Sequence, residues 1–155
     1  MRIFRKGAIF LPAILISLTL CFTNTAAAGD IILNDLKGGA VNLSSPKNKP
    51  AILFFWTTWC PYCRKEIKAL NQNYAQMKKE GITLFAVNIG ESSDKIQRFF
   101  KDYALNFEVL LDKDGRAADN YDVIGVPTYI FLDKNGRIIS HENTLPVDYK
   151  NLLLK

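Results

Sequence analysis

The chain has 155 residues, of which 48% are hydrophobic and 23% are charged, and its formal net charge is +5. A chain of this length forms one compact domain and little more. Three positive charges, at Arg2, Arg5 and Lys6, lie in an N-terminal leader, so the remainder carries +2 and shows no basic stripe. This composition argues against a nucleic-acid-binding protein.

The leader is the first predicted element. Its basic start is followed by the apolar run GAIFLPAILISLTLCF and by the small residues of TNTAAAGD, which is the pattern of a signal peptide. Ala26 and Ala28 stand at the A-x-A positions. We therefore predict a signal peptide over residues 1–28 and an exported domain, periplasmic or otherwise extracytoplasmic, over residues 29–155.

Two other fates of the leader stay open. The apolar run approaches the roughly 18 to 20 residues that span a bilayer, which would make it an uncleaved N-terminal membrane anchor, although Pro12 argues against this. Cys21 is a candidate for lipid attachment, but the residue before it, Leu20, is larger than such processing prefers.

The segments after the leader alternate between strands and helices. Residues 30–44 are predicted to be a β-hairpin with a Gly-Gly turn, and a loop follows. The continuous apolar run of residues 51–56 predicts a strand buried on both faces. Apolar residues then recur at helical spacing up to Gly81. They are Ile67, Leu70, Tyr74 and Met77.

A second buried strand is predicted over residues 82–89. Ser93 and Asp94 then open a helix whose apolar face holds Ile96, Phe99, Phe100 and Tyr103. Residues 106–112 are expected to be extended.

The last part of the domain is predicted to hold a brief helix and a loop over residues 116–127, a hairpin over residues 128–140 and a closing helix. The order of elements predicts an α/β three-layer sandwich with a mixed central sheet and an N-terminal β-hairpin.

Two cysteines, Cys60 and Cys63, remain once the leader is removed, and they lie where the first buried strand gives way to a helix. Unpaired N–H groups and the helix dipole at a helix N-terminus stabilise an anion such as a thiolate. Cys60 is therefore the predicted nucleophile and the expected exposed thiol. Pro61 suits the first helical turn. Cys63 is close enough to resolve a mixed disulfide.

A metal site and a static disulfide are the alternative roles of the cysteine pair. Structural zinc needs four ligands, whereas the domain offers two cysteines and one histidine, His141, so no metal site is predicted. A static disulfide that closes so short a loop adds little stability. A redox-active Cys60–Cys63 disulfide is the favoured interpretation.

The stretch FFWTTWCPYCRKEI resembles the active-site segment of thioredoxin-like proteins, with W-C-x-x-C at a strand–helix junction. DLKGGAVNLS, FAVNIGES and YDVIGVPTYIFLDKNGRI together resemble the exported TlpA/ResA-type thiol-disulfide reductases, several of which serve cytochrome c maturation. This resemblance covers nearly the whole domain and implies a thioredoxin-like fold. The dipeptide between the cysteines, Pro61-Tyr62, is instead familiar from glutaredoxins, and these two residues help to set the redox potential.

The resemblance also assigns residues around the cysteine pair. Pro127 in GVPT matches the cis-proline that faces the cysteines in thioredoxin-like proteins. A cis bond there lets the backbone of Val126 pair with an extended substrate. Trp59, Pro61 and Tyr62 complete the predicted substrate-binding surface. An ordinary turn proline is the alternative at Pro127.

Glu66 matches an acidic residue that follows the second cysteine in ResA-like proteins. Its spacing of three residues from Cys63 places both on one helical face, so Glu66 is a candidate to take the proton of Cys63. The buried aspartate that thioredoxin carries six residues before its first cysteine is Phe54 here, so an acid–base group must come from elsewhere. The alternative for Glu66 is a solvated helix face.

Two further residues near the motif have expected positions. Trp56 is expected to pack in the core. Glu91 in GES approaches the active-site region if the family likeness holds, and a solvated surface position is the alternative.

These features predict an exported thiol-disulfide oxidoreductase that reduces disulfides in partner proteins, with apocytochrome c as the favoured substrate. The chemistry needs no cofactor, because the cysteine pair carries the electrons and a membrane donor of the thiol-transfer type replenishes them. A monomer is expected. Two alternatives stay open: a dithiol oxidase or isomerase, and a copper-delivery protein in which His141 joins the cysteines, although copper carriers of this fold separate their cysteines by three residues.

Overall fold

The computed structural model describes residues 30–44, 48–101 and 104–154, so the predicted leader and Tyr103 lie outside the described residues. The strands are β1 (Ile32–Asp35), β2 (Ala40–Asn42), β3 (Ala51–Trp56), β4 (Thr83–Ile89), β5 (Glu108–Asp112), β6 (Thr128–Leu132) and β7 (Ile138–Glu142). The helices are α1 (Pro61–Lys79), α2 (Ser93–Phe99), α3 (Arg116–Asn120) and α4 (Tyr149–Leu153). Within the described ranges, none of these helices has the length and apolarity needed to cross a membrane.

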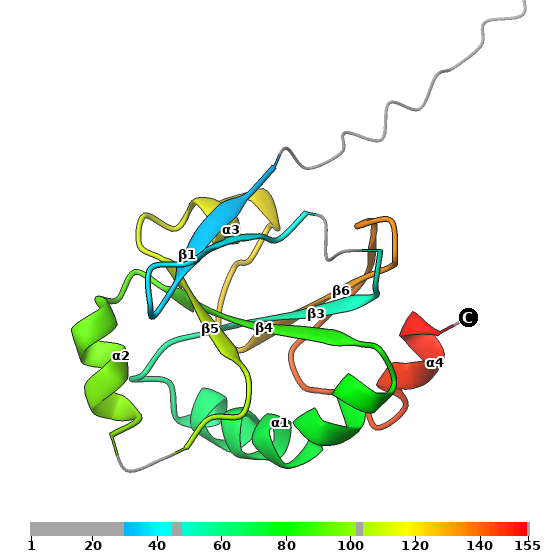
Figure 1. Cartoon of the computed structure of the whole chain (residues 1–155), viewed down its shortest axis with the longest axis horizontal. Helices are drawn as coiled ribbons and strands as arrows, with labels where there is room; N and C mark the ends of the chain where they lie inside the picture. Colours follow the sequence, from blue (N-terminus) through cyan, green and yellow to red (C-terminus); the bar gives the residue numbers. More distant parts are fainter. Residues whose placement is uncertain (1–29, 45–47, 102–103, 155) are drawn as a thin grey trace, which may run out of the picture.

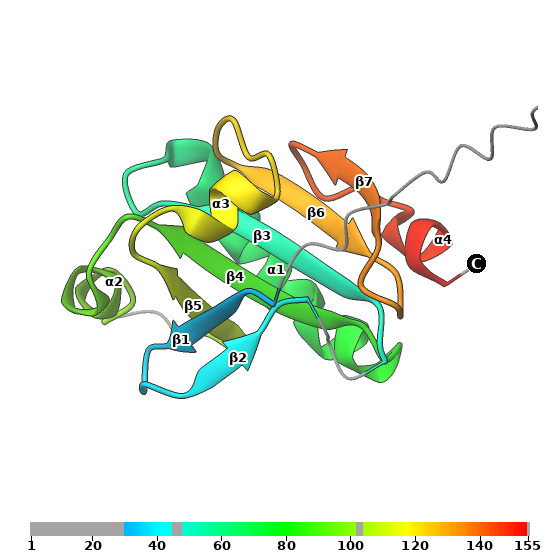
Figure 2. The same ribbon diagram turned by 90° about the horizontal axis from the view of Figure 1, so that it is seen from above.

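The described strands form one seven-stranded sheet in the order β2-β1-β5-β4-β3-β6-β7 (Figure 2). β4 pairs in parallel with β3 and with β5, and the other neighbouring pairs are antiparallel. All six residues of β3 are buried, which confirms the predicted strand that is covered on both faces. The sheet is mixed, as the sequence predicted.

The sheet separates two apolar clusters. Because successive side chains of a strand point to opposite faces, β3 contributes Phe54 and Trp56 to one cluster and Leu53 and Phe55 to the other. Helices α1, α2 and α4 cover the first face and α3 covers the second, where side chains of the β1–β2 hairpin also pack (Figure 1). This arrangement confirms the predicted three-layer sandwich.

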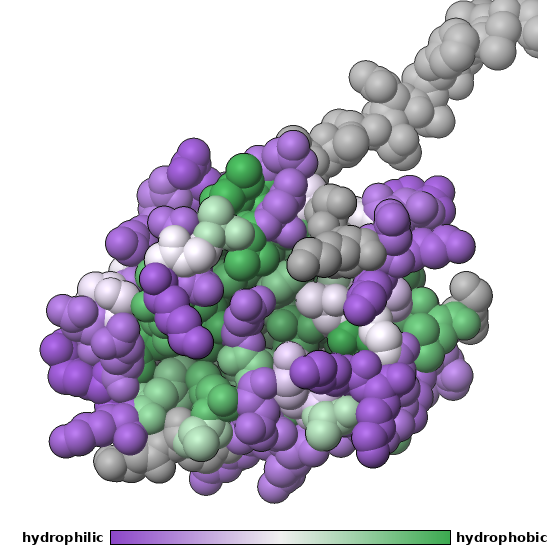
Figure 3. Space-filling model, viewed as in Figure 1, coloured by the Kyte–Doolittle hydropathy of each residue, from purple (hydrophilic) through white to green (hydrophobic). Residues whose placement is uncertain are grey.

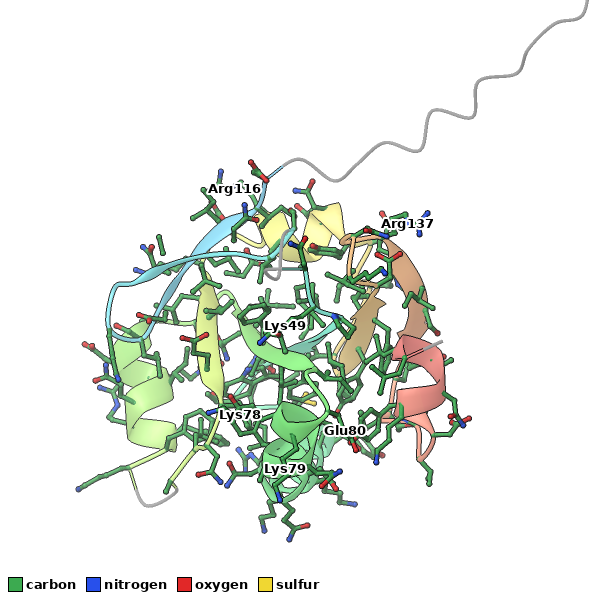
Figure 4. All side chains as sticks on the ribbon, turned by 45° about the vertical axis from the view of Figure 1, so that its right-hand side comes forward. Lys49, Lys78, Lys79, Glu80, Arg116 and Arg137 are labelled. Atoms are coloured by element: carbon green, nitrogen blue, oxygen red, sulfur yellow. The ribbon has the colours of Figure 1, made fainter. Side chains whose placement is uncertain are left out.

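Helix α1 is the longest described helix and carries the cysteine pair at its N-terminal end. It ends before Gly81, whose φ of +76° favours glycine, and this confirms the predicted end. Lys78 and Lys79 lie in its last turn, where positive charge complements the helix dipole (Figure 4). The neighbouring Glu80 accepts a hydrogen bond from the Tyr149 hydroxyl at 3.3 Å, which ties α4 to α1.

Helix α2 is shorter than its apolar pattern predicts. Its N-cap is Ser92, whose side-chain oxygen accepts from the Lys95 N–H at 3.3 Å, and its last residue is Phe99. Phe100 is therefore the C-cap rather than part of the helical face. It still packs on Trp56, at 5.4 Å between ring centroids, because the apolar contact survives the end of the helix.

The surface is mostly polar. Figure 3 shows hydrophilic side chains around the rim of one face of the molecule, with apolar groups between them. Arg116 and Arg137 lie at the surface on the side of the sheet away from α1 (Figure 4). Each forms an exposed ion pair, to Asp114 and Asp133 respectively, and such pairs add little stability.

Candidate active site

Cys60 is the N-cap residue of α1, with an extended backbone, and Pro61 is the first helical residue. The Cys63 backbone N–H donates a hydrogen bond to the Cys60 sulfur over 3.2 Å. At a helix N-terminus the first backbone N–H groups have no partner within the helix. One of these N–H groups therefore points at the Cys60 sulfur, where it stabilises a thiolate. As a thiol, Cys60 donates to the Val126 carbonyl oxygen over 3.7 Å.

Cys63 lies one turn further along α1 and is fully buried, and both cysteines are free thiols. Burial raises the pKa of the Cys63 thiol to about 12, and the hydrogen bond and charge of Cys60 act in the same direction against a smaller opposing effect of the Thr57 backbone. Cys63 therefore holds its proton at neutral pH. The two thiols therefore lie in different surroundings, Cys60 at the helix N-cap and Cys63 one turn into the helix with its side chain fully buried.

The expected exposure of Cys60 is wrong. Its exposed fraction is 3%, close to the 0% of Cys63, because its sulfur turns inward to the helix N-terminus and to the Val126 carbonyl. The groups exposed beside it are apolar: Trp59 is 63% exposed and Tyr62 is 69% exposed. The exposed surface beside the cysteine pair is therefore formed by these aromatic side chains rather than by the Cys60 sulfur.

The peptide bond between Val126 and Pro127 is cis, which confirms the expected bond geometry and excludes an ordinary trans turn proline. The loop that contains this bond leads directly into β6, which pairs with β3, the strand that precedes the cysteines. Ile124, two residues before Val126, is fully exposed. The sequence patterns did not single out Ile124, although a bulky apolar residue in a loop is a signal worth following.

The loop that leads into Cys60 is fixed by hydrogen bonds to Thr58. The backbone N–H and the hydroxyl of Thr58 each donate to the Glu91 carboxylate over 2.7 Å. Arg64 donates to the backbone carbonyl oxygen of Thr58 over 3.1 Å. Asn88 and Lys95 also bind Glu91, over 2.8 and 2.6 Å. Glu91 therefore lies at the active-site loop, and because it is buried the solvated surface position is wrong.

These contacts keep the Glu91 carboxyl group negatively charged. Burial alone raises the pKa of this carboxyl group, but the hydrogen bonds from Lys95, Asn88 and Thr58 outweigh it and lower the pKa from 4.5 to about 2. The negative charge of Glu91 therefore stabilises the folded state fully above pH 4.5, and this contribution is lost as the pH falls toward 2.

Glu91→Gln is expected to lower the free energy of unfolding by about 2 kcal/mol at pH 7, because a charged acceptor of several hydrogen bonds is lost. The difference from the wild type should shrink at about pH 3, because the carboxyl group is then protonated in the unfolded state, where its pKa is 4.5, but still mostly charged in the folded state, where its pKa is about 2. Urea unfolding at both pH values checks this, with Glu108→Gln, at an exposed position on β5, as the matched control. An equal difference at the two pH values would contradict the assignment.

Glu66 is half-buried and points to the sheet side of α1. Its Oε2 accepts a hydrogen bond from the Tyr129 hydroxyl over 2.6 Å and one from the Leu145 backbone N–H over 3.3 Å. The solvated-face alternative is therefore wrong. Tyr129 is fully buried and pairs in register with Phe54, the position where thioredoxin has its buried aspartate. The sequence patterns did not single out Tyr129, because its surroundings are typical of an ordinary strand residue.

Two further residues considered in the sequence analysis lie in the core and at the surface. Trp56 is fully buried against Phe99 and Phe100, which confirms its predicted packing. His141 lies exposed on β7, in register with Ile130. In the described part of the chain, no group of three or more His, Cys, Asp or Glu side chains is arranged to hold a metal ion.

The chain is similar in sequence to known proteins. Residues 25–141 match the model of the AhpC/TSA family. Thiol-disulfide oxidoreductase ResA of Bacillus subtilis is 35% identical over 131 residues, which are 81% of this chain and 73% of that protein. ResA of Geobacillus kaustophilus is 35% identical over 113 residues, which are 73% of this chain and 65% of that protein. The chain therefore spans about two thirds to three quarters of these relatives' length.

Solved structures share the fold as well. The crystal structure of a secreted Mycobacterium tuberculosis disulfide oxidoreductase, described as homologous to Escherichia coli DsbE, has a TM-score of 0.66 and 29% sequence identity. The match covers 78% of this chain and 91% of that one. From the dithiol at the N-terminus of α1 and from these matches, the chain belongs to the AhpC/TSA family and is a ResA-like thiol-disulfide oxidoreductase.

Proposed function

We propose that the protein is an exported reductase of disulfides in partner proteins, working as a monomer through the Cys60–Cys63 pair. One observation carries the proposal: the Cys60 sulfur lies at the N-cap of α1, 3.2 Å from the Cys63 backbone nitrogen, with the Val126 carbonyl on its other side. A thiolate is stabilised there and lies next to a backbone that can hold a substrate.

The reaction has two exchange steps. The Cys60 thiolate attacks one sulfur of the substrate disulfide, so that a mixed disulfide forms and the other substrate sulfur leaves as a thiolate. Cys63 then loses its proton and attacks the Cys60 sulfur, which releases the second substrate thiolate. Two electrons pass from the protein to the substrate, and protonation of the two thiolates yields two substrate thiols.

The order of the two steps follows from what raises the pKa of Cys63. Burial acts throughout, but the hydrogen bond and charge of Cys60 disappear once Cys60 is in a mixed disulfide. Cys63 therefore holds its proton before the first step and gives it up more readily before the second. Glu66, on the same helical face, is the carboxylate that accepts this proton.

The substrate-binding surface surrounds Cys60. Trp59 and Tyr62 present exposed apolar side chains, and Pro61 joins them at the helix start. Pro127 offers no backbone N–H, so an extended substrate segment pairs with the backbone groups of Val126 beside the sulfur. Such pairing positions the substrate disulfide along the line of attack.

The substrates and the electron donor follow from the family and from the leader. The signal-peptide pattern of residues 1–28 and a relative described as secreted support export. In that compartment, apocytochrome c presents oxidised C-x-x-C-H cysteines that must be reduced before haem attachment. A membrane donor of the thiol-transfer type would return electrons to the Cys60–Cys63 disulfide.

Reduction of a C-x-x-C-H peptide tests this function directly. The reduced protein is expected to convert an oxidised peptide of this kind to its dithiol, with one peptide reduced for each Cys60–Cys63 disulfide formed, as counted by thiol titration and mass spectrometry. If electrons instead flow from the reduced peptide to the oxidised protein under the same conditions, the protein is a dithiol oxidase.

A further inference from the structure

We propose that Tyr129 is a positioning residue for the resolving step: its hydroxyl holds the Glu66 carboxylate in place to accept the proton of Cys63. This inference rests on the proposed function and extends it to a residue on a different element, β6. It concerns only the second exchange step, so it can fail while the attack by Cys60 stands.

The geometry joins three side chains across two elements. Glu66 follows Cys63 by one helical turn on α1, so both face the sheet. The Tyr129 hydroxyl approaches Glu66 from β6 at 2.6 Å, a short distance typical of a hydroxyl that donates to a carboxylate. The Leu145 N–H donates to the same oxygen over a longer 3.3 Å, so Tyr129 is the stronger anchor.

Tyr129 cannot exchange this partner for water. It is fully buried, and its ring packs on Phe54 at 4.8 Å between centroids and on Phe131 at 6.4 Å. A buried hydroxyl needs one hydrogen-bond partner, and here that partner is the carboxylate nearest to the resolving cysteine along α1. Phe54 has no acidic side chain, so Glu66 is the acid–base group that Tyr129 positions.

Glu66 and Cys63 are the titratable groups that act on Tyr129. Burial raises the pKa of Tyr129, and the hydrogen bond and charge of Glu66 and the charge of Cys63 raise it further, so Tyr129 remains a donor at neutral pH. Cys60 at the helix N-cap and the Thr57 backbone after β3 in turn act on Cys63. Tyr129 therefore lies close enough to both the Cys63 sulfur and the Glu66 carboxylate for their charges to act on its pKa.

The proton balance of the step is simple. In the mixed disulfide, the S–H bond of Cys63 breaks, its proton passes to Glu66, and the new S–S bond to Cys60 forms while the substrate thiolate leaves. Tyr129 keeps its own proton and holds the carboxylate throughout. The departing thiolate takes up a proton afterwards, and Glu66 returns its proton to solvent.

Tyr129→Phe removes only the hydroxyl and tests the proposal with Ellman's reagent as the disulfide. Attack by Cys60 releases a first coloured thiolate, and resolution by Cys63 releases a second, so stopped-flow absorbance separates the two steps. The first phase is expected to be unchanged, and the second to slow by about tenfold, the size of one hydrogen bond to a charged group. The ratio of the second rate to the first should therefore fall, whereas a general disturbance of the site would slow both phases.

Three further variants make the result specific. Tyr121→Phe removes a buried tyrosine hydroxyl that bonds Ser44 on the opposite face of the sheet, and should leave both phases unchanged. Glu66→Gln should slow the second phase. The double variant Glu66→Gln/Tyr129→Phe should be no slower than Glu66→Gln alone, since the tyrosine acts through the glutamate.

Additive effects in the double variant, or an unchanged second phase in Tyr129→Phe, would overturn the inference. Thermal unfolding of each variant shows that the fold is retained. If the wild type shows no first phase, the proposed function is overturned instead. Failure of the proposed function is thus distinguishable from failure of the inference about Tyr129.

Discussion

Cys63→Ser is expected to stop turnover and to trap substrate proteins on Cys60. The variant keeps the backbone N–H at position 63 that donates to the Cys60 sulfur, so the first attack proceeds. It lacks the sulfur that releases the substrate, so the mixed disulfide persists. Turnover should fall by at least about a thousandfold, as expected when a covalent step is removed.

Non-reducing gels of cell extracts check this result. Cys60→Ser is the matched control, because it keeps the buried thiol of Cys63 and removes the sulfur at the helix N-cap. It should form no mixed disulfides. Trapped complexes on Cys60→Ser but not on Cys63→Ser would reverse the assignment of attacking and resolving thiols.

Alkylation of the reduced protein is expected to modify Cys60 and to leave Cys63 almost untouched near pH 8. Burial and the neighbouring Cys60 raise the pKa of Cys63 from 9.0 to about 12. Its thiolate fraction at this pH is therefore lower than that of an unperturbed cysteine by on the order of a thousandfold. Alkylation of Cys63 should therefore rise about tenfold with each pH unit up to about pH 12. Peptide mapping after timed iodoacetamide treatment measures both rates.

The Cys60→Ala variant separates the causes of this protection. It removes the hydrogen bond and charge of Cys60 but leaves the burial of Cys63, so the alkylation rate of Cys63 should increase without reaching that of a free thiol. Equal labelling of both cysteines in the wild type at neutral pH would show that Cys63 does not hold its proton.

The order and type of the main elements were predictable because each rests on a local pattern. The apolar run from Ala51 to Trp56 predicts a buried strand, and the spacing of Ile67, Leu70 and Met77 predicts the helix that follows. Both cysteines then fall at a helix N-terminus without any knowledge of the tertiary structure. The resemblance to thioredoxin-like proteins supplied the cis bond at Pro127.

The contacts that surround the sulfurs were less predictable because they join distant parts of the chain. Tyr129 and Glu66 are 63 residues apart, and Thr58 and Glu91 are 33 residues apart. Neither pair follows a helical or strand spacing, so only the packed sheet brings them together. The burial of Cys60 depends in the same way on the position of the Val126 loop.

The reduction potential of the Cys60–Cys63 pair tests the proposed reductase function most directly. Equilibration of the full domain with glutathione or dithiothreitol buffers, followed by trapping and mass counting of free thiols, gives the potential at which half of the protein is oxidised. A reductase is predicted to lie near the value of thioredoxin, about −270 mV. A potential above about −180 mV, in the range of disulfide isomerases and oxidases, would contradict reduction as the direction of the reaction.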